Sequence, residues 1–160
     1  RDESSRWADL ADSWEPLAAW PYYAFNDMFA VMSMVGAGRL DPAQQFVDSR
    51  RAWARDAPKA VTNVAMTQNI GIPVCQAIVD FGRGHDDAVL DGLLPIRNRI
   101  GEFGGSHAQR DAVQRTLLVS ALRARRLDLA RALLSERISV KPASPWNWRR
   151  QAQFVALTSP

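Results

Sequence analysis

The segment Gly104-Gly-Ser-His-Ala-Gln-Arg-Asp111 combines residue types that could bind an anion. Glycines before a helix start leave backbone N–H groups open to an anion, and Arg110 would add a fork of donors for a carboxylate or phosphate. The same residues fit a structural interpretation, in which Ser106 and Gln109 form a capping box and Asp111 lies near the positive helix end. Gly-Gly-Ser is much shorter than a Walker loop and no strand is expected before it, which argues against nucleotide binding.

His107 and Asp111 are four residues apart, so they share a helix face on which the carboxylate could orient the imidazole. If Asp27 from an earlier helix met them, one groove would hold a histidine and two carboxylates for acid–base chemistry. The chain has two histidines, no His-Glu-x-x-His motif and one cysteine, so we expect no metal and no cofactor. Catalysis is the less favoured interpretation; it would use Asp27, His107, Arg110 and Asp111.

Asn26 and Asp27 form a polar pair in an otherwise apolar and aromatic helical segment. A buried polar pair needs hydrogen-bond partners, and a structural network would supply them from neighbouring hairpins. The arginines considered for that network are Arg97, Arg99 and Arg110. In the alternative interpretation these polar groups lie on an inner surface, where Arg110 with Asn26 or Asn69 would clamp a peptide carboxylate.

Helical periodicity extends along the whole chain, because apolar residues recur at spacings of three and four. N-terminal caps are expected at Asp41, Ser106 and Ser144, and glycines mark several helix ends. Irregular backbone is expected at Gly71-Ile-Pro73 and at Pro95. The predicted helices cover 6–19, 22–36, 42–55, 60–82, 86–100, 106–124, 127–138 and 144–157.

Three short turns resemble one another, and each precedes an acidic residue near the next helix start. They begin at Gly38, Gly84 and Arg125, with separations of 46 and 41 residues. Short turns produce antiparallel hairpins. We therefore predict an all-α fold of three stacked helix hairpins in a degenerate tetratricopeptide-like superhelix, flanked by an N-terminal and a final capping helix. A closed helical bundle is the alternative.

Several segments in order along the chain are similar to one known family. They are Phe25-Asn-Asp27, Gly71-Ile-Pro-Val-Cys-Gln-Ala77, Leu93-Leu-Pro-Ile-Arg-Asn-Arg-Ile100, Gly104-Gly-Ser-His-Ala-Gln-Arg-Asp111, and Glu136-Arg137 with Lys141-Pro-Ala-Ser144. Over roughly residues 20–145 the chain resembles the tetratricopeptide repeat protein 38-like family. The resemblance implies an all-helical repeat fold and brings no known reaction or ligand. It also implies that residues 1–160 form one domain from the C-terminal part of a longer protein, with contacts to the upstream part.

Composition favours one globular domain in a reducing compartment. The chain has 160 residues, 47% of them hydrophobic, and no apolar run long enough for a membrane helix. Cys75 has no partner for an internal disulfide, so we expect a buried, inert thiol and a cytoplasmic protein. Basic residues gather in residues 101–160, ten against four acidic ones. No run of five or six consecutive bases occurs, which argues against a nucleic-acid partner.

These observations lead to one favoured function. We expect a non-catalytic helical-repeat scaffold that binds a peptide or protein segment on its inner face. The candidate binding residues are Asn26, Asp27, Asn69, His107, Arg110 and Asp111. The alternative is a small-molecule enzyme or an anion-binding protein built on four of these residues.

Overall fold

The computed structural model describes residues 3–58 and 61–159, and this part of the chain is all-α, as predicted. No strand occurs in these two ranges. The α-helices are α1 (Glu3–Trp14), α2 (Ala24–Gly36), α3 (Leu40–Asp56), α4 (Val64–Met66), α5 (Ile72–Arg83), α6 (Asp86–Leu93), α7 (His107–Arg123), α8 (Leu127–Val140) and α9 (Pro145–Thr158). The 3₁₀ turns cover Glu15–Ala19, Leu94–Ile96 and Ile100–Phe103, and a π-helical turn covers Thr67–Gly71.

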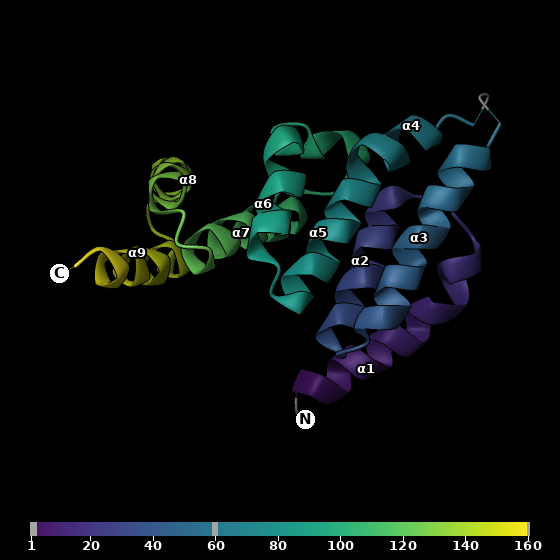
Figure 1. Cartoon of the computed structure of the whole chain (residues 1–160), viewed down its shortest axis with the longest axis horizontal. Coiled ribbons are helices and arrows are strands. Elements are labelled where there is room, and N and C mark those ends of the chain that lie inside the picture. Colours follow the sequence, from purple (N-terminus) through teal and green to yellow (C-terminus); the bar gives the residue numbers. More distant parts are fainter. Residues whose placement is uncertain (1–2, 59–60, 160) are drawn as a thin grey trace.

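Successive helices pack on one another from α1 at one end of the molecule to α9 at the other (Figure 1). α2 contacts α3, α5 contacts α6, and α7 contacts α8, while α2 also contacts α5 and α5 contacts α7. α1 packs on α2, and α9 packs on α8. This order is the one expected when antiparallel hairpins stack on their sequence neighbours. It supports stacked hairpins, and the tetratricopeptide-like superhelix stays a prediction.

The three similar turns adopt the same backbone conformation. Gly38, Gly84 and Arg125 all have left-handed φ angles, of 76°, 76° and 58°. In each turn the following residue donates its N–H to the carbonyl five residues earlier, at 2.8 to 2.9 Å. This is the hydrogen bond that closes a helix C-terminus around a left-handed residue. The third turn places an arginine where the first two have glycine, at a steric cost.

The prediction that Asp41 caps a helix is wrong. α3 begins two residues before the predicted start at 42, at Leu40, with Arg39 as its N-cap residue, and no side chain of the described residues caps it. An Asp41 carboxylate oxygen lies instead 3.5 Å from Nη2 of Arg83 on α5. Asp41 is therefore in the first turn of α3, where its charge still favours the positive helix end.

Proline and glycine interrupt two of the predicted helices. In the segment 86–100, α6 ends two residues before Pro95, which lacks an N–H, and the chain continues as 3₁₀ turns. The segment 60–82 begins as helix only at α4, and its first residue lies outside the described residues. Pro73 is accommodated at the start of α5, directly after the π-helical turn.

The Gly104-Gly105 pair ties the start of α7 to α2. Both glycines have positive φ, of 88° and 77°, which other residues rarely adopt. A Cβ atom on Gly104 would lie 1.7 Å from Oη of Tyr23, and one on Gly105 would lie 2.2 Å from Cε2 of Phe25. The close approach of these aromatic rings therefore requires glycine at both positions.

The core passes without interruption through the stacked helices. Phe25 packs edge to face against Phe29 and Phe103, with ring centroids 5.0 and 5.4 Å apart. Cys75 is buried among apolar residues, as predicted, and burial raises the pKa of its thiol. A thiol with a raised pKa is seldom ionised, so Cys75 is a core residue rather than a nucleophile.

Candidate functional site

The Gly104–Asp111 segment forms the predicted capping box. The Ser106 hydroxyl accepts the Gln109 backbone N–H at 3.3 Å, and the Gln109 side chain accepts the Ser106 N–H at 2.9 Å. Arg110 turns back on this segment, where Nη1 donates to the carbonyl oxygens of Gly104, at 3.1 Å, and of Gly105. Its Nη2 lies 3.4 Å from His107 Nδ1. Arg110 therefore stabilises the turn before α7 and directs few donors toward a ligand.

Asp111 lies at the centre of three cationic side chains. Nε of Arg115 donates to it at 2.8 Å, Nη1 of Arg137 donates at 2.9 Å, and Nζ of Lys141 lies 3.4 Å away. Burial by itself would raise the pKa of this carboxyl, but the hydrogen bonds and charges of the three cations lower it. One negative charge among three positive ones leaves the cluster with a positive surplus.

The start of α9 holds the Arg137 guanidinium in place. Nε of Arg137 donates to Oδ1 of Asn147 at 3.3 Å, and its guanidinium carbon lies 4.9 Å from the centroid of a Trp146 ring. The Asn147 side chain is fully buried and donates to the carbonyls of Arg137 and Lys141. Asn147 was not predicted as a site residue, although its position three residues after Ser144, whose hydroxyl caps α9, is a sequence signal for it.

A cavity of about 540 Å³ opens beside this cluster, between α7, α8 and residues 97–101. Its volume is within the range typical of ligand pockets. The charged side chains that line it are Arg97, Arg110, Arg137, Lys141, Asp111 and Glu136. Arg97 donates to both carboxylate oxygens of Glu136, at 2.7 and 3.0 Å. Four cations against two anions give the cavity, here named the basic cavity, a positive potential.

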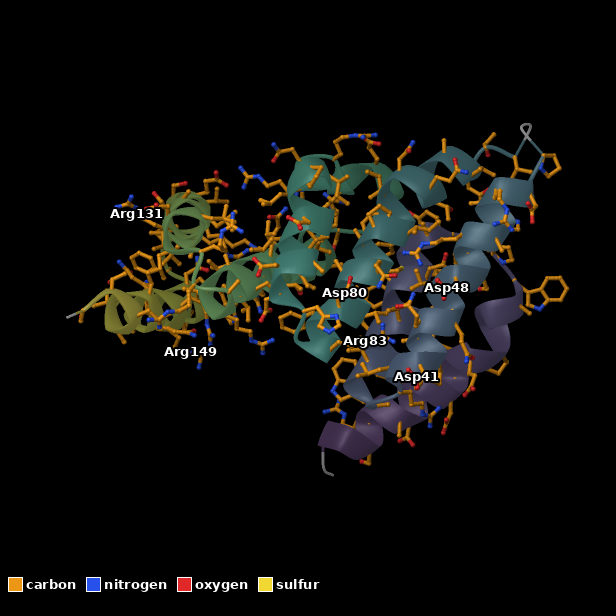
Figure 2. The ribbon with its side chains drawn as sticks, viewed as in Figure 1. Asp41, Asp48, Asp80, Arg83, Arg131 and Arg149 are labelled. Atoms are coloured by element: carbon orange, nitrogen blue, oxygen red, sulfur yellow. The ribbon has the colours of Figure 1, made fainter. Side chains whose placement is uncertain are left out.

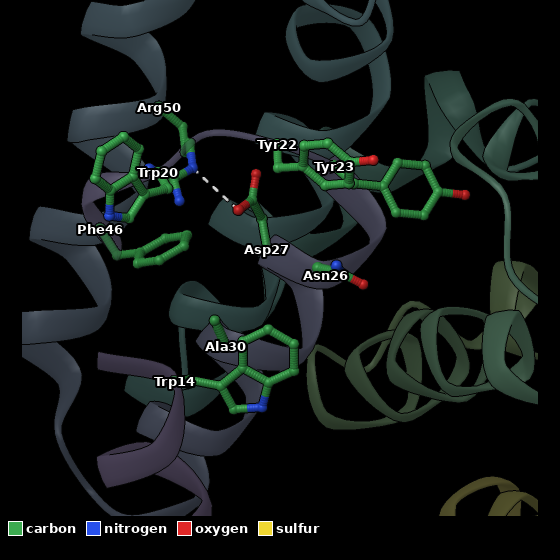
Figure 3. Close-up of a pocket in the computed structure, with 9 residues that line it drawn as sticks. All are labelled: Trp14, Trp20, Tyr22, Tyr23, Asn26, Asp27, Ala30, Phe46 and Arg50. Carbon is green, nitrogen blue, oxygen red and sulfur yellow. Dashed lines mark hydrogen bonds and ion pairs between the residues drawn. The ribbon is translucent and has the colours of Figure 1, made fainter. Parts of the chain in front are cut away.

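Asp27 lies elsewhere, in the first hairpin. Its Oδ1 accepts a hydrogen bond from Nε of Arg50 on α3 at 3.0 Å, and both side chains are buried (Figure 3). Burial raises the pKa of Asp27 despite the opposing effect of Arg50. The predicted network with Arg97, Arg99 or Arg110 is therefore wrong, because the partner of Asp27 comes from its own hairpin.

The six candidate residues separate into different places. His107, Arg110 and Asp111 line the basic cavity. Asn26 and Asp27 line another cavity of about 180 Å³. Asn69 is exposed on the π-helical turn and lines neither of these cavities. The structure thus brings three predicted residues together, and the four residues of the enzyme alternative do not share one cavity.

An apolar cavity of about 190 Å³ lies on the face shared by α2, α5 and α7. Its lining includes Trp7, Met32, Val35 and Phe81, and it has no charged side chain. Its chemistry differs from that of the basic cavity, which lies on the opposite side of α7.

Charge is unevenly distributed over the molecule. Figure 2 shows Asp41, Asp48 and Asp80 together with Arg83 on the α3 and α5 side, and Arg131 and Arg149 on α8 and α9. Residues 101–160 carry ten basic and four acidic residues.

Within residues 3–58 and 61–159, no three His, Cys, Asp or Glu side chains are grouped closely enough to hold a metal ion. None of the described helices is both long and apolar enough to cross a membrane.

Comparison with protein-family models and with solved structures gives no assignment. No protein-family model matches this chain, and no solved structure matches it. The function must therefore be argued from the geometry of the cavities.

Proposed function

We propose that this chain is a non-catalytic helical scaffold that binds an acidic segment of a peptide or protein in the basic cavity. The observation that supports this most directly is the surplus of positive charge on the cavity wall, four cations against two carboxylates. A volume of about 540 Å³ can accommodate one or two acidic side chains with part of their backbone. Charge complementarity of this kind sets both the rate of association and the choice of partner.

Lys141 is the cation best placed to contact a ligand directly. The guanidinium groups of Arg97, Arg110 and Arg137 already donate to protein oxygens. The Lys141 side chain is 46% exposed, and its Nζ makes one long contact, 3.4 Å from Asp111. An ammonium group has three donors, so donors remain for a ligand carboxylate. The arginines would contribute mainly through their charge.

The contacts around the candidate acid–base residues favour binding over catalysis. Asp111 has a lowered pKa, which makes it a weak proton acceptor near neutral pH. His107 is exposed, with Nδ1 facing Arg110, and Asp27 lines a different cavity. No described carboxylate is therefore positioned to work with the imidazole as a base.

The test measures binding of a fluorescein-labelled peptide rich in glutamate to the full chain by fluorescence polarisation. Matched peptides with glutamine or lysine in place of glutamate serve as probes of charge. We expect saturable binding of the acidic peptide only, which weakens as salt rises. Lys141→Gln should weaken it about fivefold or more, as expected for a charge-assisted contact.

Arg149→Gln is the matched control, since it removes the same charge from an exposed position on α9 that does not line the cavity. It should leave the affinity within about twofold, because screening weakens charges beyond about 8 Å at physiological salt. Equal binding of the glutamine peptide, or an equal loss in both variants, would contradict the proposal.

The similarity of residues 93–100 and 104–111 to the tetratricopeptide repeat protein 38-like family supports the same proposal. Helical-repeat proteins use extended surfaces to hold peptides. Membership of that family, contacts with an upstream part of the protein, and a cytoplasmic location suited to the free thiol of Cys75 all belong to this proposal.

A further inference from the structure

The cavity around Asp27 has aromatic walls. Figure 3 shows the Asp27 carboxylate in the middle of the lining side chains. Five aromatic side chains line this aromatic cavity: Trp14, Trp20, Tyr22, Tyr23 and Phe46. Two of them form an open rim, since Trp20 is 74% exposed and Tyr22 is 81% exposed. Rings that are exposed to this degree beside a cavity are available to stack on a ligand.

One carboxylate oxygen remains available in the aromatic cavity. Oδ1 of Asp27 accepts the hydrogen bond from Arg50, and Oδ2 accepts none from any described residue. The Asp27 side chain is only 9% exposed, and it lines the cavity. A carboxylate oxygen at the cavity wall that accepts no hydrogen bond from a described residue can accept one from a ligand. The cavity therefore favours a ligand that brings a hydrogen-bond donor.

The charge in this cavity argues for a neutral ligand. Arg50 already balances the charge of Asp27, and its guanidinium carbon lies 4.2 Å from the centroid of the Phe46 ring. An arginine thus already occupies the place that a cation would take against an aromatic wall. A second cation would be repelled by Arg50, whereas a neutral N–H group would meet no such repulsion.

We propose that the aromatic cavity binds one neutral aromatic ring system with an N–H donor, of the indole type. The ring would stack against Trp20 and Tyr22, and its N–H would donate to Oδ2 of Asp27. A volume of about 180 Å³ suits this size, because an apolar protein cavity of about 150 Å³ holds one benzene molecule. The aromatic cavity is separate from the basic cavity, so either could bind without the other.

The test titrates indole and 1-methylindole into the ¹⁵N-labelled full chain and follows the backbone and side-chain N–H signals of the residues that line the cavity. Indole should give saturable shifts there. 1-Methylindole fits the same walls but has no N–H, so it should bind about tenfold more weakly. Tetramethylammonium, a cation without a donor, should give no saturable shift at these residues.

Protein variants separate stacking from nonspecific association. Trp20→Ala removes an exposed ring, so the fold should survive, and indole affinity should fall about fivefold. Trp148→Ala is the matched control, because Trp148 is 53% exposed on α9, far from the cavity along the chain of helices. Equal affinities for indole and 1-methylindole, tighter binding of tetramethylammonium, no saturable shift, or equal losses in both variants would each overturn the proposal.

Discussion

The first hairpin (α2 and α3) and the third hairpin (α7 and α8) each contain an ion pair between their two helices, but the charges that surround the two pairs differ. In each, a carboxylate on the first helix pairs with an arginine on the second: Asp27 with Arg50, and Asp111 with Arg137. Both arginines lie twelve residues after the left-handed residue of their turn. Asp27 lies in a cavity with balanced charge and aromatic walls, whereas Asp111 lies among three cations.

The second hairpin (α5 and α6) shows that two helices can pack as a hairpin without an ion pair at this position. Twelve residues after Gly84 the chain has Ile96, which is buried in the core. Apolar packing thus replaces the ion pair at this position, in agreement with the general finding that such pairs add little net stability. The difference between the first and third hairpins therefore lies in charge balance, and it separates a neutral cavity from one suited to anions.

The largest effect is expected for Arg50→Gln. This change leaves the Asp27 carboxylate, whose side chain is 9% exposed, without the positive charge that pairs with it. Removal of one partner of a buried pair costs about 3 kcal/mol or more of the free energy of unfolding. Urea denaturation measures this loss. Arg51→Gln, which breaks the exposed pair with Asp48 on the same helix, should cost under about 0.5 kcal/mol. A loss below about 1 kcal/mol for Arg50→Gln would contradict the role of the buried pair.

Asp111→Asn should cost about 2 kcal/mol at pH 7, because the hydrogen bonds of charged groups are lost while two of the cations remain partly hydrated. The folded protein lowers the pKa of Asp111, so its stabilisation is present above the usual value of 3.8 and is lost as pH falls through the lower, folded value. The difference between wild type and variant should therefore shrink below about pH 3.8. If the stability difference between wild type and Asp111→Asn grew on acidification, the three cations would not lower the pKa of Asp111.

Asp27 should show the opposite pH dependence. Its pKa is raised by burial in the folded state, so the folded protein binds this proton more tightly than the unfolded chain does. Acidification toward the usual value of 3.8 should then add stability from this group. Chemical-shift titrations can measure the raised pKa of Asp27 and the lowered pKa of Asp111 in a single sample.

The smallest effect concerns the turn of the third hairpin. Arg125→Gly places glycine at a φ of 58°, as the first two turns already have it, and should raise the free energy of unfolding by about 0.5 to 1 kcal/mol. Arg126→Gly is the matched control, because Arg126 has a φ of −80°. It should not stabilise the protein. A gain from Arg126→Gly equal to that from Arg125→Gly would show that glycine does not act through the left-handed conformation.

Local features of this fold were predictable from the sequence. The capping boxes, the turns and the apolar stripes depend on residues within four or five positions of one another, so their pattern is visible in the chain. Ser106 with Gln109 is the clearest example. The failed cap at Asp41 is instructive, because a different residue, Arg39, serves as N-cap while Arg83 pairs with the carboxylate.

Pairings between helices were not predictable. Asp27 meets Arg50 across 23 residues, and Asp111 meets Arg137 across 26. With 18 arginines in the chain, the sequence offers many equivalent partners. Only the stacking of the helices selects among them. His107 and Asp111, which are four residues apart, line the same cavity, whereas Asp27 from another hairpin lines a different one.

If surplus positive charge makes the basic cavity an anion site, Glu136→Gln should increase the affinity of this cavity for anions. Glu136 is exposed, lines the cavity and holds both terminal nitrogens of Arg97. Its replacement removes a negative charge and releases that guanidinium. The affinity for the glutamate-rich peptide should rise at least about threefold, since a charged hydrogen bond contributes more than 1 kcal/mol. Glu102→Gln, the same change at an exposed pair outside the cavity, should leave it unchanged. An unchanged or weaker affinity in Glu136→Gln would contradict an anion site in this cavity.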